Sequence, residues 1–138
     1  MIILAFDYGT KKIGVAIGQK ITKTARPLKK ITFKNNKIKW IKISKLINEW
    51  KPKKIIIGLP LTLKGKKQNI TIITKNFAKK IKKKYNIKII LHNEILTTKL
   101  AKSYLLKKKK KKYLKNDIDS IAAVFILESW FKKKYNIL

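Results

Sequence analysis

Hydrophobic residues recur along this chain in two patterns: short apolar runs and longer segments with helical spacing. The first three segments are apolar runs separated by turn residues, which is typical of strands joined by hairpins. Further along, apolar runs alternate with segments in which hydrophobic residues recur every three or four positions. The pattern predicts strands at residues 2–7, 13–18, 21–33, 54–58 and 87–91, and helices from 38 to before Pro52 and at 70–85, 98–106 and 120–134.

The same spacing predicts which residues face the core. Pro27 lies inside the third strand, so this strand is expected at the edge of a sheet or to be interrupted. A loop is expected at Leu59–Leu61, and the last strand is expected to run into His92–Glu94, with Glu94 after its carboxyl end. Inward positions of the first, second and last helices are predicted at Ile38, Ile41, Leu46, Ile47 and Trp50, at Ile73, Phe77 and Ile81, and at Ala123, Leu127, Trp130 and Phe131.

The order of these elements defines a fold class. Three strands in succession predict an antiparallel start, and the later strand–helix alternation requires parallel crossovers. The sheet is therefore expected to be mixed and flanked by helices, in an α/β fold. A chain of 138 residues suits one domain over residues 1–138, with enough burial for a core of its own.

The composition limits the cellular location and the kinds of metal site expected for this domain. The chain has no cysteine, which excludes disulfides and thiolate metal ligands. No apolar stretch reaches the length of a membrane span, and the first residues lack the basic start of a secretory signal. We therefore expect a cytoplasmic protein that has no membrane partner.

The net charge is +31, which attracts any polyanion and favours nucleic acid as a partner. Arg26 is the only arginine, and all the other strong bases are lysines. Lysine, isoleucine and asparagine have A/T-rich codons, so base composition of the genome explains much of this excess. The charge supports an anionic partner without identifying it.

Carboxylates are scarce, so their positions are informative. Asp7 ends the first strand, Glu94 follows a later strand, and Asp119 precedes the last helix. Ligands bind at the carboxyl ends of strands in open α/β sheets, and converging carboxylates repel one another unless a cation intervenes. Oxygen ligands without histidine or cysteine suit Mg²⁺ or Mn²⁺, which support phosphodiester hydrolysis.

Each of these carboxylates also has a purely structural interpretation. Asp7 precedes Tyr-Gly and fits a turn, and Glu94 fits a solvated loop. Asp117 and Asp119 fit helix caps, although one can cap while the other points toward the site. His92 is the only histidine, and a structural or incidental role is expected for it. Surface roles on amphipathic helices fit the remaining two acids, Glu49 and Glu128.

Basic and polar residues near these acids are candidates for contacting phosphate. Six consecutive lysines fill positions 107–112, between two predicted helices, where they form either a solvated loop or a phosphate-tracking loop. The candidate nucleic-acid-binding residues are Thr10, Lys11, Lys12, Arg26, Lys107, Lys108, Lys109 and Lys110.

Several segments together resemble one known family. The sequence Asp7-Tyr-Gly-Thr-Lys-Lys-Ile-Gly-Val-Ala16 resembles the opening of the YqgF family of pre-16S rRNA nucleases, which are related to Holliday junction resolvases. Further blocks of the same resemblance, in the same order and over nearly the whole chain, are Thr24-Ala-Arg-Pro27, Ile57-Gly-Leu-Pro60, the Glu94 segment and Asp119-Ser-Ile-Ala-Ala123.

The resemblance implies an RNase H-like fold, with a five-stranded mixed sheet whose first three strands are antiparallel. It also implies that Asp7, Glu94 and Asp119 correspond to the family's acidic positions, and that the activity is maturation of the 5′ end of pre-16S rRNA. Around the glutamate the family usually has Asp-Glu-Arg, whereas this chain has Asn93-Glu94-Ile95. The missing arginine removes one clamp for phosphate or carboxylate.

Three functional hypotheses follow. The first is a metal-dependent nuclease (a hydrolase) acting on pre-rRNA as a monomer or homodimer, or alternatively on branched DNA as a dimeric junction resolvase. The second is a nucleotide-binding phosphotransferase of the actin and sugar-kinase kind, suggested by Asp7-Tyr-Gly-Thr10, although 138 residues hardly supply a second lobe. The third is a non-catalytic RNA-binding module of ribosome assembly, suggested by the charge.

Overall fold

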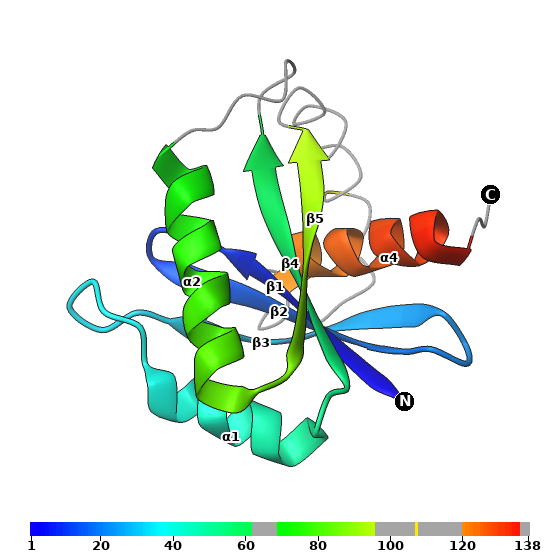
Figure 1. Cartoon of the computed structure of the whole chain (residues 1–138), viewed down its shortest axis with the longest axis horizontal. Helices are drawn as coiled ribbons and strands as arrows, with labels where there is room; N and C mark the ends of the chain where they lie inside the picture. Colours follow the sequence, from blue (N-terminus) through cyan, green and yellow to red (C-terminus); the bar gives the residue numbers. More distant parts are fainter. Residues whose placement is uncertain (62–68, 96–106, 108–119, 136–138) are drawn as a thin grey trace.

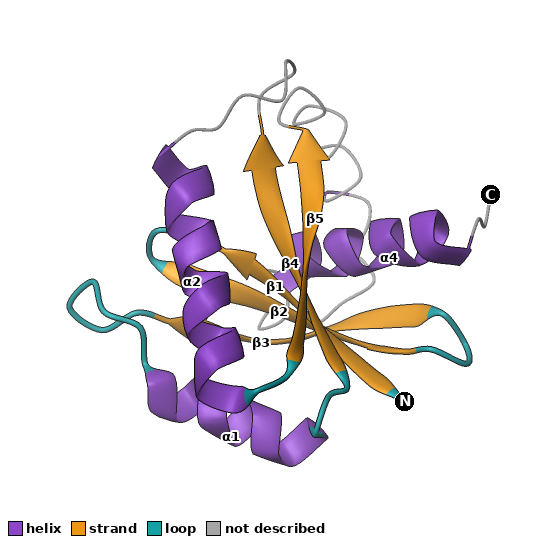
Figure 2. Ribbon diagram, viewed as in Figure 1, coloured by secondary structure: helices purple, strands orange, loops and turns teal. Residues whose placement is uncertain are grey.

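A computed structural model describes residues 1–61, 69–95, 107 and 120–135 of the chain, without the side chains of residues 61, 94 and 95. It contains a five-stranded sheet in the order β3-β2-β1-β4-β5 (Figures 1 and 2). The strands are β1 (Ile2–Tyr8), β2 (Lys12–Gln19), β3 (Thr24–Thr32), β4 (Lys54–Leu61) and β5 (Lys88–Ile95). The helices are α1 (Trp40–Trp50), α2 (Asn69–Tyr85) and α4 (Ile121–Tyr135).

The sheet is mixed, as predicted. β1 pairs antiparallel with β2 and β2 antiparallel with β3, whereas β4 runs parallel to both β1 and β5. β3 lies at one edge, which accommodates Pro27 and confirms the expectation for that strand. β5 forms the other edge, and the carboxyl ends of β1, β4 and β5 lie at the same end of the sheet (Figure 1).

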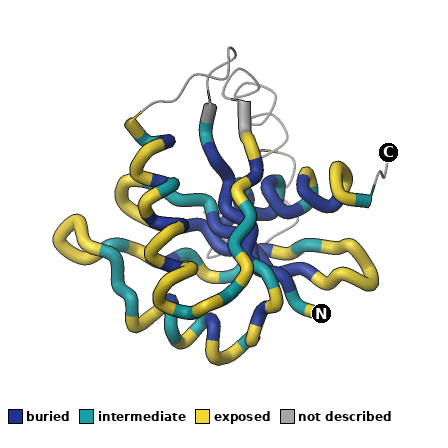
Figure 3. Tube along the Cα trace, viewed as in Figure 1, coloured by how far each residue is buried: buried dark blue, intermediate teal, exposed yellow. Residues whose placement is uncertain are grey.

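Helices cover the two faces of the sheet unequally. α1 and α2 lie on one face and α4 crosses the other, so buried segments fill both layers (Figures 1 and 3). Alternate residues of β1 divide between the layers: Leu4 and Phe6 pack with α1 and α2, whereas Ile3 and Ala5 pack with α4. The same alternation assigns each remaining residue of β1 to one of the two faces.

Two predicted helix faces were partly wrong. On α1, Ile43 and Ile47 are buried, whereas Ile41 is 70% exposed. On α2, Phe77 and Ile81 are buried as predicted, but Ile73 is 45% exposed. In both helices the period of 3.6 residues determines which residues share a face. A count of apolar residues alone does not show which of these faces is buried.

The inward position that Ile73 was expected to hold is filled by two threonines of α2. Thr71 and Thr74 are completely buried, and both hydroxyls donate hydrogen bonds to carbonyl oxygens, of Pro60 and Ile70 respectively. Burial of a hydroxyl is tolerated when its hydrogen bond is made. Hydrophobicity alone therefore could not identify these core positions.

Two expected strand ends also differ from the structure. Leu59–Leu61 continue β4, and His92–Glu94 continue β5, because the two strands remain paired as far as Leu61 and Ile95. Glu94 thus lies within a strand, opposite Pro60, rather than after one. The helix expected at 98–106 lies outside the described residues.

The ends of α1 and α2 follow the expected signals. α1 ends at Trp50, before Pro52, and Lys51 adopts a left-handed conformation and donates its N–H to the Ile47 carbonyl. Asn86 does the same after α2, donating to Lys82. The last helix buries Ala123, Leu127, Trp130 and Phe131, which confirms that prediction. Within the described part, no helix is both long and apolar enough to cross a membrane.

Candidate active site at the carboxyl end of the sheet

Asp7 lies at the carboxyl end of the central strand β1. Its backbone pairs with Gly14 of β2, and the residue is half-buried. Because Ala5 packs against α4, the alternation of the strand directs Asp7 to the α4 face as well. Opposite it in the sheet stands Gly14, which has no side chain.

The turn after Asp7 is held tightly by the backbone. The N–H of Gly9 donates to the Lys12 carbonyl at 2.9 Å. A Cβ atom at position 9 would approach that same oxygen to 2.9 Å, closer than real Cβ atoms come. Glycine is therefore required by the close approach, and the turn keeps the exposed residues Thr10, Lys11 and Lys12 near Asp7.

The register places two β5 residues near the level of Asp7. Phe6 pairs with Ile57, which pairs with Leu91, so Asp7 is level with Gly58 and His92. Two strand spacings separate the Asp7 and His92 backbones, about 10 Å. The backbone of Glu94 lies two residues beyond His92, in the same alternation phase.

His92 belongs to the packing between β5 and α4. It is only 8% exposed, and its Nε2 atom lies 2.9 Å from the Ser129 hydroxyl of α4. This contact ties the edge strand to the helix. The structural role expected for the only histidine agrees with this position.

The start of α4 is fixed to the sheet by a side chain that the sequence did not single out. Ser120 is completely buried, and its hydroxyl accepts a hydrogen bond from the Val15 N–H at 3.0 Å. This bond forms where the β2–β3 register shifts between Ile13 and Val15. It holds the first turn of α4 one residue from Gly14, the partner of Asp7.

One feature of the sequence points to a role for Ser120. A serine directly before an apolar helical run is typical of a helix N-terminus. That signal predicts a cap on the helix itself, whereas the structure shows a bond to a distant strand. Ser129 had no signal at all, because its partner His92 lies 37 residues away in the sequence.

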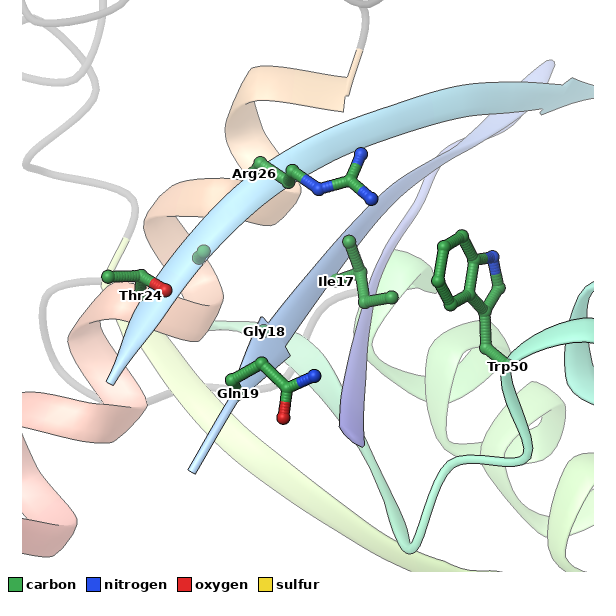
Figure 4. Close-up of a pocket in the computed structure, with 7 residues that line it drawn as sticks. Ile17, Gly18, Gln19, Thr24, Arg26 and Trp50 are labelled. Carbon is green, nitrogen blue, oxygen red and sulfur yellow. The ribbon is translucent and has the colours of Figure 1, made fainter. Parts of the chain in front are cut away.

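Arg26 does not join the Asp7 group. It pairs with Ile17, whose side chain packs with the α1 and α2 layer, and so it lies on the face opposite Asp7. Its guanidinium carbon is 5.6 Å from the centre of the Trp50 ring. Figure 4 shows Arg26, Ile17 and Trp50 around a hollow. The hollow has a volume of about 370 Å³ and lies between the turn end of the β2–β3 hairpin and Trp50, the last residue of α1.

The remaining predicted site residues are only partly described. Lys107 is exposed, whereas Asp119 and Lys108–Lys110 lie outside the described residues. Among the described side chains no three acids, histidines or cysteines form a metal-binding group. Asp119 and the Glu94 side chain are not among the described parts. Carboxylate oxygens without sulfur or imidazole ligands suit Mg²⁺ or Mn²⁺ in their chemistry.

Solved structures share this fold at low sequence identity. The fowlpox virus Holliday junction resolvase has a TM-score of 0.59 and 19% identity, and the match covers 98% of this chain and 99% of that one. Thermus thermophilus RuvC in complex with a Holliday junction substrate has a TM-score of 0.56 and 11% identity, covering 99% and 97%. These likenesses establish an RNase H-like fold of the resolvase kind.

Sequence relatives are much closer. A protein of Buchnera aphidicola subsp. Baizongia pistaciae, described as a candidate pre-16S rRNA nuclease, is 53% identical over 132 residues, covering 95% of this chain and 96% of that protein. A Klebsiella pneumoniae protein of the same description is 44% identical over 133 residues, covering 96% of each. The profile of the RuvX family, described as Holliday junction resolvase, matches residues 1–133. The chain therefore belongs to the RuvX family of nucleases, as its resemblance to the YqgF proteins predicted.

Proposed function

We propose that this chain is a cytoplasmic, divalent-metal-dependent endonuclease that processes the 5′ end of pre-16S rRNA. Asp7, Glu94 and Asp119 serve as its catalytic carboxylates and hold Mg²⁺ or Mn²⁺. The descriptions of the Buchnera and Klebsiella relatives support the substrate. The family and the fold support phosphodiester cleavage.

One observation carries the assignment: Asp7 stands at the carboxyl end of β1 on the face that α4 covers, beside the anchored start of that helix. Asp119 is the residue directly before Ser120, and Glu94 is two residues beyond His92 on β5. A carboxylate from each of three elements could therefore meet at this end. Such a group supplies the oxygen ligands that Mg²⁺ and Mn²⁺ prefer.

The chain's own groups divide the work of cleavage. The three carboxylates orient the ion, and Thr10, Lys11 and Lys12, exposed beside Asp7, contact the phosphates that flank the scissile bond. Mg²⁺ or Mn²⁺, when bound, supplies Lewis acidity toward a phosphodiester oxygen and lowers the pKa of water. Lys107–Lys110 add charge along the substrate, and Arg26 reaches only nucleic acid that extends to the opposite face.

The test is cleavage of a precursor fragment that contains the 5′ end of 16S rRNA, with Mg²⁺ or Mn²⁺, by the wild type and Asp7→Asn. Loss of a metal ligand is expected to lower the rate by more than about a hundredfold, since loss of a group that merely supports a ligand costs 10–100-fold. Glu49→Gln, which changes an exposed acid of α1, makes the same charge change and should keep full activity.

The outcomes separate the hypotheses. Equal cleavage by Asp7→Asn and wild type would contradict the assignment of Asp7. Retained RNA binding with no cleavage by either protein, in either metal, would favour the non-catalytic assembly module. Purified RNA-free protein and a metal-free control exclude contaminating ribonuclease.

The second candidate is resolution of Holliday junctions, which the description of the matching family favours. A resolvase makes two symmetric nicks and is therefore expected to act as a dimer on four-way DNA. Paired nicks on a four-way junction, with no cutting of the rRNA precursor, would select this candidate. Cutting of the precursor alone would select the ribosomal role.

A further inference from the structure

Four lysines gather at the end of the sheet farthest from Asp7. Lys54 begins β4, Lys88 begins β5, Lys20 follows β2, and Lys134 is in the last turn of α4. We call these four residues the amino-end patch. They lie on two strands, a turn and a helix that are distant in sequence, so the fold brings them together.

The closest pair in the patch consists of direct neighbours in the sheet. Lys54 pairs in register with Lys88, and both share the alternation phase of Ile56 and Ile90, which pack on the α4 face. Like charges directly opposite on adjacent strands are destabilising. The Lys54 ammonium lies over the buried Trp130 ring, 5.6 Å from its centre, which holds it on this face.

The electrostatics of Lys54 show that the patch is crowded with positive charge. Burial lowers the pKa of Lys54, and the charges of Lys88, Lys134 and Lys20 lower it further. Each of these neighbours opposes the charged form of Lys54. A bound anion would relieve this repulsion, because it would interact favourably with all four ammonium groups at once.

A hollow connects the patch with the other end of the sheet. It has a volume of about 380 Å³ and follows β5 from Ile90 to His92, with Lys133 and Lys134 on its α4 side. Glu94 is two residues beyond His92 on the same edge strand. Lys88 and Glu94 are therefore joined by a path about 20 Å long, at 3.3 Å of strand per residue.

The length of the path and its charge favour a phosphodiester backbone as the occupant. A B-DNA duplex advances about 3.4 Å per base pair, so about six base pairs span the path, and an A-form RNA duplex, which has a smaller rise, needs slightly more. A small anion would neutralise the patch alone and leave Lys133 and the hollow unused. A polyanion can contact the patch, the hollow and the carboxyl end of the sheet together.

We propose that the amino-end patch, together with the hollow along β5, is a second binding site for the sugar-phosphate backbone of nucleic acid. The backbone is gripped there about 20 Å from the position of cleavage. The inference rests on the proposed function for its substrate class, but binding at the patch does not require cleavage. Its role is to hold the substrate's flanking helix along the β5 edge.

The experiment measures binding of a labelled, blunt RNA duplex long enough to span the path, in EDTA and at increasing salt. The variant Lys54→Gln/Lys88→Gln/Lys134→Gln removes three patch charges. The matched control Lys42→Gln/Lys45→Gln/Lys79→Gln removes three charges from exposed positions of α1 and α2. EDTA separates binding from catalysis, so failure of the proposed nuclease activity leaves this test intact.

Each phosphate contact adds about 0.9 to the slope of log affinity against log salt for a duplex. The patch variant is therefore expected to lose two to three units of slope, roughly 0.9 for each lost contact, and the control less than one. The charge-preserving variant Lys54→Arg/Lys88→Arg/Lys134→Arg should keep the wild-type slope. Equal losses in the patch variant and the control would overturn the proposal, because bulk charge would then explain the binding.

Thermal melting followed by circular dichroism tests the alternative that these lysines serve the fold. Lysines in the last turn of a helix interact favourably with its dipole. If that were their main role, the patch variant would melt at a lower temperature and keep its salt slope, which would overturn the proposal. We expect the patch variant to melt at or above the wild-type temperature, because it removes mutual repulsion.

Discussion

The two faces of the sheet are packed in different ways. Under α1 and α2, large side chains fill the layer, and Phe77 lies 4.6 Å from Tyr8 and 6.0 Å from Trp40 between ring centres. Under α4, small sheet residues let the helix approach closely: a Cβ at Gly18 would come within 2.7 Å of Leu127. Buried polar bonds from Ser120 and His92 then fix α4 in place.

This difference suggests a division of labour between the faces. The α1 and α2 layer supplies large apolar burial and meets the site end through Phe77 on Tyr8 and Thr71 on Pro60, whereas the α4 layer holds the elements that carry the site. Changes in the first layer should therefore affect stability more than activity. Changes in the second should affect activity more than their cost in stability explains.

The largest expected effect comes from Phe77→Ala. Phe77 is 2% exposed at the centre of the aromatic group, so its truncation should lower the free energy of unfolding by about 3–5 kcal/mol. Urea unfolding measures this loss. Cleavage per folded molecule, measured where the variant remains folded, should fall much less than stability does, because Phe77 contacts Tyr8 but lies on the face opposite Asp7.

Ile73→Ala on the same helix is the matched control. Ile73 is 45% exposed, so the substitution should change the free energy of unfolding by less than about 0.5 kcal/mol. A large loss there would contradict the observed phase of α2. A large defect in cleavage by folded Phe77→Ala would break the division between the faces.

The next effect is expected from Ser120→Ala. The variant leaves the Val15 N–H without its hydroxyl partner in a buried position, at a cost of about 1–3 kcal/mol. The larger consequence should be on kcat, because the first turn of α4 loses its attachment beside Gly14. Ser120→Thr keeps the hydroxyl and should restore much of the cleavage rate.

Ser129→Ala provides the comparison on the same helix. Ser129 is exposed and bonds to His92, so its loss should cost about 1 kcal/mol or less and leave kcat nearly unchanged. Equal effects of the two serine substitutions on kcat would show that Ser120 stabilises the helix without positioning the site. Cleavage assays with saturating precursor RNA distinguish these outcomes.

The smallest effect is a pH dependence that arises at Lys54. Burial and neighbouring lysines lower its pKa in the folded state below 10.5. Between the lowered pKa and 10.5 the unfolded chain binds more protons, so the free energy of unfolding rises with pH. Below that window both states are protonated, and the unfavourable contribution of Lys54 is fully present.

Lys54→Gln should lack this rise, and Lys42→Gln, at an exposed position of α1, should keep it. Urea midpoints measured from neutral pH to pH 10.5 report the difference. A rise of equal size in Lys54→Gln would mean that other groups cause it. The result would also show whether the repulsion within the amino-end patch is present in solution.

The fold could be predicted from the sequence because apolar runs and helical spacing identify elements directly. The three antiparallel strands, the parallel crossovers and the buried face of α4 were all predicted correctly. The errors lie where strand pairing or helical phase determines the structure. Leu59–Leu61 and His92–Glu94 are strands because each segment supplies the other's hydrogen-bond partners. Such mutual pairing is not visible in either segment alone.

The candidate site was less accessible to sequence reasoning. Asp7 could be placed because it ends an apolar strand, and the structure locates it on the α4 face. Arg26 could not be assigned a face, since the alternating apolar pattern of its strand is interrupted at Pro27 and the pairing with Ile17 is not visible in the sequence. The assignments of Asp7, Glu94 and Asp119 as catalytic residues stay predictions.

The register shift between β2 and β3 makes this part of the molecule sensitive to chain length rather than to side-chain identity. Ile13 pairs with Ile31 and Val15 pairs with Leu28, so β3 spends one more residue than β2 over the same span. Lys29 and Lys30 together stand opposite Gly14, so β3 bulges by one residue there. Deleting one of them would let the ladder close and compete for the Val15 N–H that holds the start of α4.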